Sequence, residues 1–222
     1  MSLIEFKHDF FAGIDVGQVN DWTAISVIER IRAVPRPDVH RTVVEEARQE
    51  ARATPTRLDL VHLQRIPLGT YYPKQVEIIA NLLQQPILSG VTSYMDITGV
   101  GRGPFDMLKA AKVRNLHGVM ITGSRGEAKQ QPYGWSVGKA ELVNRVQIEM
   151  QTGRLGFAQE LELADTLERE LMEFRVQINS HGNQEFKARE GQNDDLVLSV
   201  SYAVFGALRP IPVHSMDMRF VA

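Results

Sequence analysis

The chain has 222 residues, with 25 Lys and Arg against 27 Asp and Glu, and it contains no cysteine. This length fits one domain with a substantial core, and 43% hydrophobic with 23% charged residues excludes a largely disordered chain. The lack of cysteine excludes disulfides, thiolate zinc sites and a cysteine nucleophile, and the net charge of -2 gives no overall sign of nucleic-acid binding. No apolar run is long enough to span a bilayer and the N-terminus lacks a signal peptide's apolar core, so we expect no membrane partner.

The first third of the chain predicts β-structure. Apolar runs rich in β-branched residues, and one run that alternates apolar and polar residues, predict three strands at 10–16, 22–31 and 58–66. Residues 17–21 have the composition of a hairpin loop, so we expect them to join the first two strands. The charged, Ala-rich stretch 33–57 predicts either a solvated helical insertion or a mobile loop.

The remainder predicts alternating helices and strands. In chain order we expect a helix from Pro73 to before Gly90, a strand at 91–97, a helix at 104–112, a strand at 117–123, and helices at 139–153, 163–176 and 195–208. A three-strand meander followed by βαβα and a closing helix is the element order of the ribonuclease H-like fold. The expected class is therefore α/β, with a central mixed sheet of five or more strands, an antiparallel meander plus parallel strands, flanked by helices. We expect one domain over 1–209 and a C-terminal tail over 210–222.

Acidic residues fall at the ends of apolar elements. Asp15 lies within an apolar strand, Asp96 ends another strand before a Gly-rich loop, and Asp194 and Asp195 open the last apolar helix. Each has an ordinary explanation as a turn residue, a strand end or a helix cap. If the first and fourth strands are neighbours, however, these carboxylates converge, and their repulsion requires protons or cations. Oxygen-only ligands favour two Mg²⁺ or Mn²⁺ ions, which supports metal-dependent phosphodiester hydrolysis.

Short motifs in this order resemble the nuclease domain of tailed-bacteriophage terminase large subunits. They are Gly-Ile-Asp-Val-Gly at 13–17 with Asp-Trp-Thr-Ala at 21–24, Met-Asp-Ile-Thr-Gly-Val-Gly at 95–101, Ser-Val-Gly-Lys-Ala-Glu-Leu at 136–142 and Asn-Asp-Asp-Leu at 193–196. The resemblance extends over about residues 11–205. It implies that Asp15, Asp96 and Asp195 hold two divalent cations, Mg or Mn, with Asp194 as neighbour and second ligand and Asp21 bound through water. Which of Asp194 and Asp195 ligates directly stays open, because adjacent residues at a helix start point in different directions.

The resemblance also implies an activity and partners. The activity is a Mg/Mn-dependent endodeoxyribonuclease that cuts DNA during phage genome packaging. The expected partners are double-stranded DNA, the packaging ATPase, the small terminase subunit and the portal protein, and the expected location is the cytoplasm of a bacterial host of a phage or prophage. Full terminase large subunits also carry a packaging ATPase, and the nearest match to its phosphate loop, at 134–140, has the wrong glycine spacing. We therefore expect an excised nuclease domain or a stand-alone relative.

Charge is unevenly distributed along the chain. Residues 102–145 hold eight Lys or Arg against three acids, a local +5, and residues 146–186 hold three Arg against eight acids, a local -5. A basic surface beside the acidic site predicts weak, salt-sensitive DNA binding, although solvated charge without a partner is an equal explanation. The candidate DNA-binding residues are Arg102, Lys109, Lys112, Arg125, Lys129 and Lys139.

Three other functions remain open. Another ribonuclease H-like nuclease, of the resolvase or transposase type, would use the same acidic site. An actin-like ATP-binding domain is an alternative because residues 13–17 also resemble its first phosphate motif, although that fold needs two such domains. A non-catalytic domain of a packaging complex would instead give Asp15 or Asp96 ordinary hydrogen bonds and no metal.

Overall fold

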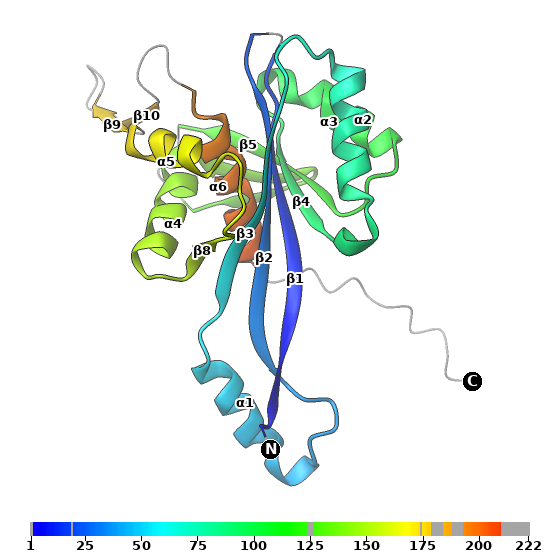
Figure 1. Ribbon diagram of the computed structural model, residues 1–222, viewed down its shortest axis with the longest axis vertical. Coiled ribbons are helices and arrows are strands. Elements are labelled where there is room, and N and C mark those ends of the chain that lie inside the picture. The colour runs from blue at the N-terminus through cyan, green and yellow to red at the C-terminus, as the bar shows by residue number, and fades with distance from the viewer. Residues whose placement is uncertain are drawn as a thin grey trace.

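The computed structural model describes residues 2–18, 20–123, 127–173, 175–178, 184–187 and 193–209. These residues form an eight-stranded mixed sheet in the order β6-β7-β5-β4-β1-β2-β3-β8, with a separate two-stranded sheet of β9 (Arg175–Ile178) and β10 (Gln184–Lys187). Helices cover both faces of the large sheet (Figure 1). The predicted tail at 210–222 lies outside the described residues.

The three predicted strands form an antiparallel meander. They are β1 (Ile4–Asp15), β2 (Thr23–Pro35) and β3 (Arg57–Ile66), and both β1 and β2 are longer than their apolar runs predict. Their far ends extend beyond the helical layers, where α1 (Val44–Ala53) follows a short 3₁₀ turn, η1 (Arg41–Val43), beside them (Figure 1). The stretch 33–57 therefore contains a helix, as one of its two predicted alternatives requires.

Parallel strands continue the sheet on the other side of β1. The strand β4 (Thr92–Asp96) pairs with β1, β5 (Leu116–Thr122) pairs with β4, and β7 (Gly134–Gly138) pairs with β5. The predicted neighbourhood of the first and fourth strands is thus confirmed. The connections include α2 (Tyr72–Leu83), the short 3₁₀ turns η2 (Pro86–Leu88) and η3 (Gly99–Gly101), and α3 (Arg102–Ala110).

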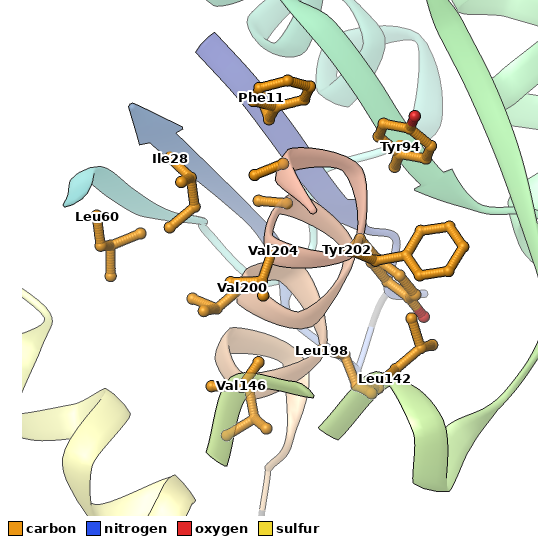
Figure 2. Close-up of a cluster of buried hydrophobic side chains, with 14 of the residues drawn as sticks. Phe11, Ile28, Leu60, Tyr94, Leu142, Val146, Leu198, Val200, Tyr202 and Val204 are labelled. Carbon is orange, nitrogen blue, oxygen red and sulfur yellow. The ribbon is translucent and has the colours of Figure 1, made fainter. Parts of the chain in front are cut away.

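Each face of the sheet has its own apolar layer. The helices α2 and α3 pack on one face, over side chains that include Ile14 and Met95. On the other face lie α4 (Lys139–Gln151), α5 (Ala164–Glu173) and α6 (Asp195–Ala207), and every residue of α6 is buried. Figure 2 shows this second layer, with α6 side chains between the strands and α4.

A glycine allows α6 to approach the sheet closely. A Cβ atom at Gly13 would lie 1.9 Å from the carbonyl oxygen of Ser199, so only glycine fits this position of β1. The approach matters for the site because Gly13 lies two residues before Asp15 on the same face of the strand.

Several short strands were not predicted. These are β6 (Lys129–Gln131), β8 (Leu155–Phe157), β9 and β10, together with β7, whose sequence was assigned only to the segment before a helix. Runs of three to five residues carry too little alternation to be recognised, and β6 is exposed throughout.

No helix in the described part of the chain is long and apolar enough to cross a bilayer.

Candidate functional site

The ends of two neighbouring parallel strands bring Asp15 and Asp96 side by side. Ile14 pairs with Met95, so the next residue on each strand is an aspartate. Alternation places Asp15 on the same face as Phe11 and Gly13, and Asp96 on the same face as Tyr94, which is the face that α6 covers. Both carboxylates are half-buried.

The start of α6 brings two more carboxylates to this edge of the sheet. Asp194 occupies the N-cap position without a side-chain capping bond, and Asp195 is the first helical residue, only 6% exposed. The charges of Asp96, Asp194 and Asp195 all act on Asp15, so the four aspartates lie at the same edge of the sheet. The positive end of the helix dipole faces this cluster.

The two strand aspartates form no ion pair among the described residues, although the charge of Lys139 acts on both of them. Burial, followed by the charges of Asp96, Asp194 and Asp195, raises the pKa of Asp15 well above its ordinary value. Burial also raises the pKa of Asp96, although its Oδ1 accepts a 2.7 Å hydrogen bond from the Thr98 backbone N–H. Within the described residues, the Asp15 carboxylate makes no hydrogen bond or ion pair. A bound cation would therefore stabilise the charged forms of Asp15 and Asp96.

The helix aspartates, in contrast, each have a basic partner. Lys139 Nζ lies 2.8 Å from Asp194 Oδ2. Arg65 donates to both oxygens of Asp195, from Nε to Oδ2 at 2.8 Å and from Nη2 to Oδ1 at 2.9 Å. Burial raises the pKa of Asp195, and the hydrogen bonds from Arg65 oppose that rise.

Glu170 of α5 completes the arrangement around Arg65. Its Oε1 pairs with Arg65 Nη2, and its Oε2 accepts the backbone N–H groups of Leu196 at 3.1 Å and Val197 at 3.3 Å. Glu170 thereby caps two of the free donors at the start of α6. Burial and then the charge of Asp195 raise the pKa of Glu170 to about 7.

A buried phenol lies behind the carboxylates. Tyr202 is fully buried on α6, and side chains on a helix tilt toward its N-terminus, which is the end where Asp194 and Asp195 lie. Its hydroxyl is directed at the carboxylate of Asp96, although the contact is not a well-formed hydrogen bond. Burial and the charges of Asp15 and Asp96 raise its pKa well above the ordinary value, so it remains a protonated donor.

A pocket of about 450 Å³ opens over this edge. The residues around it are Asp15, Val16, Gly17, Gln18, Asp21, Trp22, Val100, Asn193, Asp194 and Asp195. Asp21 is exposed on the β1–β2 loop, whose turn is closed by a 2.9 Å bond from its own N–H to the Gln18 carbonyl. The structure therefore places Asp21 at the rim of the site and Asp15 within it.

The donor chemistry of the site fits divalent metal, with one qualification in geometry. Carboxylate oxygens that form no ion pair, such as those of Asp15 and Asp96, are ligands for Mg²⁺ or Mn²⁺. As the side chains stand, however, no three His, Cys, Asp or Glu residues in the described ranges are gathered closely enough to hold one ion. Asp195 would have to exchange Arg65 for the metal.

The predicted DNA-binding residues divide between two edges of the sheet. Lys139 starts α4 at the acidic edge, and Arg102 starts α3 nearby, 3.5 Å from Asp106 and stacked on the Tyr133 ring at 4.3 Å. Lys129 is exposed on the edge strand β6. Two other candidates, Lys109 and Lys112, lie where α3 ends; Lys112 lines a pocket with Thr92 at the beginning of β4, the end of that strand opposite Asp96. Arg125 lies outside the described residues.

Solved structures share this arrangement of strands and helices. The large terminase nuclease from thermophilic phage G20c with bound magnesium matches with a TM-score of 0.59 and 20% identity, over 90% of this chain and 82% of that chain. The fold is ribonuclease H-like. The G20c nuclease with bound cobalt matches at a TM-score of 0.56 and 19% identity over 90% and 81% of the two chains. The large terminase nuclease domain of Thermus phage P74-26 matches at 0.55 and 19% over 88% and 78%.

The sequence comparisons add no family to this structural likeness. No family model matches the chain, and no curated protein matches it. The predicted resemblance to terminase nuclease domains is confirmed at the level of structure. At sequence identities of about one fifth, this likeness establishes the fold alone.

Sequence reasoning missed three residues around the site. Arg65 was only a polar position in an alternating strand, Glu170 one acid among several on a helix, and Tyr202 one residue of an apolar helix. The one available signal was helical spacing, because Tyr202 lies seven residues after Asp195 and so shares its face of the helix. The roles of Arg65 and Glu170 depend on pairing between distant elements, which the sequence does not specify.

Proposed function

We propose that this chain is a metal-dependent endonuclease of the large terminase type, which cuts DNA during phage genome packaging. The observation that carries the proposal is the Asp15–Asp96 pair, half-buried on adjacent strand ends without a cation partner, at the edge where Asp194 and Asp195 start α6. Uncompensated carboxylates at such a position destabilise the fold and are maintained where they bind a ligand.

The residues divide into direct and supporting roles. Asp15, Asp96 and Asp195 would hold two Mg²⁺ or Mn²⁺ ions, with Asp194 as neighbour or second ligand and Asp21 contributing through water. Bound ions of this kind activate a water and stabilise the leaving oxygen of a phosphodiester. Tyr202 keeps its proton and points a hydroxyl donor at the strand carboxylates, and Glu170 fixes the start of α6.

The substrate would lie over the pocket beside the acidic edge. Arg102, Lys129 and Lys139 would meet phosphates there, whereas Lys109 and Lys112 would contact DNA only beyond the far end of β4. The proposal includes double-stranded DNA as substrate, with the packaging ATPase, the small terminase subunit and the portal as partners in a bacterial host's cytoplasm. The likeness to terminase nucleases with bound magnesium and cobalt supports divalent metal as the cofactor.

One observation favours a second candidate function. Asp194 is paired with Lys139 and Asp195 with Arg65, so only Asp15 and Asp96 of the four site aspartates form no ion pair among the described residues. This pairing suits a non-catalytic domain of a packaging complex. This alternative predicts that the domain binds no divalent metal and cuts no DNA.

Cleavage of supercoiled plasmid separates the two functions. Wild-type protein should nick or linearise plasmid with Mn²⁺ or Mg²⁺ and not with EDTA, and Asp96→Ala should abolish cutting. A matched variant, Asp38→Ala, changes an exposed aspartate just after the end of β2 that is distant from the carboxylate cluster, and it should cut normally. Intact plasmid in every metal, or equal cutting by Asp96→Ala, would overturn the proposal.

A further inference from the structure

We propose that Arg65 is a positioning residue that competes with divalent cation for the carboxylate of Asp195. The inference rests on the proposed function, since it concerns the metal affinity of that same site. It assigns to Arg65 the control of when the start of α6 joins the strand aspartates in binding metal.

The contact between Arg65 and Asp195 engages both oxygens of the carboxylate. The guanidinium donates from Nε to Oδ2 at 2.8 Å and from Nη2 to Oδ1 at 2.9 Å, a bidentate fork. Bidentate, charge-assisted pairs are among the strongest and most directional of protein hydrogen bonds. While this bidentate contact is in place, both oxygens of Asp195 accept a hydrogen bond from Arg65.

Arg65 is itself held in position on three sides. Its strand position pairs with Ala24, its guanidinium stacks on the Trp22 ring at 5.3 Å, and its Nη2 also pairs with Glu170. The side chain is only 12% exposed. It therefore acts as a fixed cation of the site and not as a mobile surface charge.

The charges around the site favour the release of Asp195 from Arg65 once a divalent cation is bound. Arg65 serves two carboxylates, Asp195 and Glu170, whereas Asp15 and Asp96 have none of its charge within bonding distance. A divalent cation placed between the strand aspartates supplies charge that Asp195 can share only by releasing part of the fork. Glu170 remains as the second acceptor of Arg65, so the guanidinium keeps a partner when Asp195 leaves.

Two opposite effects follow from removing Arg65. The metal-free protein should be less stable, because a buried carboxylate loses its partner. Metal binding should become tighter, because Asp195 is then available without exchange and the site is one charge more negative. A residue with only a structural role would produce the first effect without the second.

Calorimetric titration of Mn²⁺ into metal-free protein measures the second effect directly. Arg65→Met should lower the Kd for Mn²⁺ at least about fivefold relative to wild type, a typical coupling between linked binding events. The matched control is Arg32→Met, which breaks a contact with Asp9 in the middle of β1 and should leave the Kd unchanged. An Arg65→Met variant with wild-type or weaker affinity would overturn the inference. If Arg65→Met does not fold, Arg65→Gln also removes both the fork and the charge and should still tighten binding, and unchanged affinity there would overturn the inference.

Trp22 provides a second readout that is independent of activity. The chain has two tryptophans, so Trp135→Phe leaves Trp22 as the only source of tryptophan fluorescence. In this background Mg²⁺ should change Trp22 emission as Arg65 shifts on the ring, and the change should vanish when Arg65→Met is added. Equal changes with and without Arg65, or none with it, would contradict the inference. Absence of any metal binding by wild type would instead refute the proposed function, so the two failures are distinguishable.

Discussion

The two ends of α6 are both buried and both charged, but only one of them is electrically balanced. At the C-terminal end Arg30 donates to the carbonyl oxygens of Ala207 at 2.7 Å and Arg209 at 3.0 Å, and it pairs with Asp9 at 3.1 Å. Burial opposes ionisation of Asp9, but hydrogen bonds from Arg32 and Arg30 outweigh it and lower its pKa. The Asp9 carboxylate at this end is thus paired with two arginines, and Arg30 also satisfies carbonyl groups at the end of the helix.

The N-terminal end of α6 has the opposite character. Burial and mutual repulsion raise the pKa of Asp15 well above its ordinary value, and burial raises the pKa of Asp96. Both ends are built from the same strand, β1, which carries Asp9 at one end of α6 and Asp15 at the other. The difference indicates that the fold can neutralise a buried aspartate where only stability is required. An uncompensated pair is therefore a sign of function.

The sharpest way to test this contrast is to neutralise one aspartate at each end. Asp15→Asn should reduce metal-dependent plasmid cutting at least about a thousandfold, because it removes a metal ligand. Asp9→Asn should leave cutting within about a factor of a few at a temperature where the variant is folded. Initial cutting rates with saturating Mn²⁺ provide the measurement, and similar losses in both variants would remove the distinction between the two ends.

Breaking the balanced end should cost stability in place of activity. Arg30→Met leaves Asp9 and two α6 carbonyl groups without their donor, and loss of one partner of a buried pair costs about 3–5 kcal/mol. Urea unfolding measures this free energy. As a control, Arg36→Met removes an exposed pair with Asp38 and should leave the urea midpoint unchanged. A small effect of Arg30→Met would show that this end is not the stabilising one.

The unbalanced end should also produce a characteristic pH dependence through Glu170. Its pKa is raised from 4.5 to about 7 in the folded protein, so the folded protein binds more protons than the unfolded chain between these values. In metal-free protein this group's stabilisation is full below about pH 4.5 and is lost as pH rises toward about 7, by up to about 3 kcal/mol. Glu170→Gln, which can still accept the α6 N–H groups, should flatten that fall. Urea unfolding at about pH 5 and about pH 8 in EDTA tests this, and an identical slope in the variant would contradict it.

A smaller effect is expected from neutralising the second strand aspartate. Asp96→Asn should raise the free energy of unfolding of metal-free protein by about 0.5–2 kcal/mol, because it removes one member of a repelling pair. The thermal midpoint in EDTA reports this gain. Destabilisation by Asp96→Asn would mean that the Asp96 carboxylate is already compensated.

The sequence predicted the side of the site that lies on long elements. Asp15, Asp96 and the Asp194–Asp195 pair stand at ends of strongly apolar strands and of a helix that is buried all round, so composition alone marked their positions. Their convergence followed from element order, because parallel strands with α-helical crossovers end at one edge. Local pattern was enough for this part.

The compensating charges could not be predicted in the same way. Arg65 meets Asp195 across 130 residues of sequence, and Arg30 meets Ala207 across 177. Neither arginine differs locally from a solvated strand residue, since alternation assigns a face but not a partner. The short strand β8, which pairs in parallel with β3, was missed for the same reason. Such features are determined by tertiary pairing, as is the placement of Lys109 and Lys112 away from the acidic edge.

The central claim is that Asp15 and Asp96, beside the N-terminal end of α6, are the core of a divalent-cation site because neither forms an ion pair. Calorimetric titration of Mn²⁺ into metal-free wild type, Asp15→Asn with Asp96→Asn, and Asp9→Asn tests it most directly. We expect saturable binding by wild type and by Asp9→Asn, and none by the Asp15/Asp96 double variant. Undetectable binding by wild type at millimolar Mn²⁺, or equal binding by the double variant, would contradict the account.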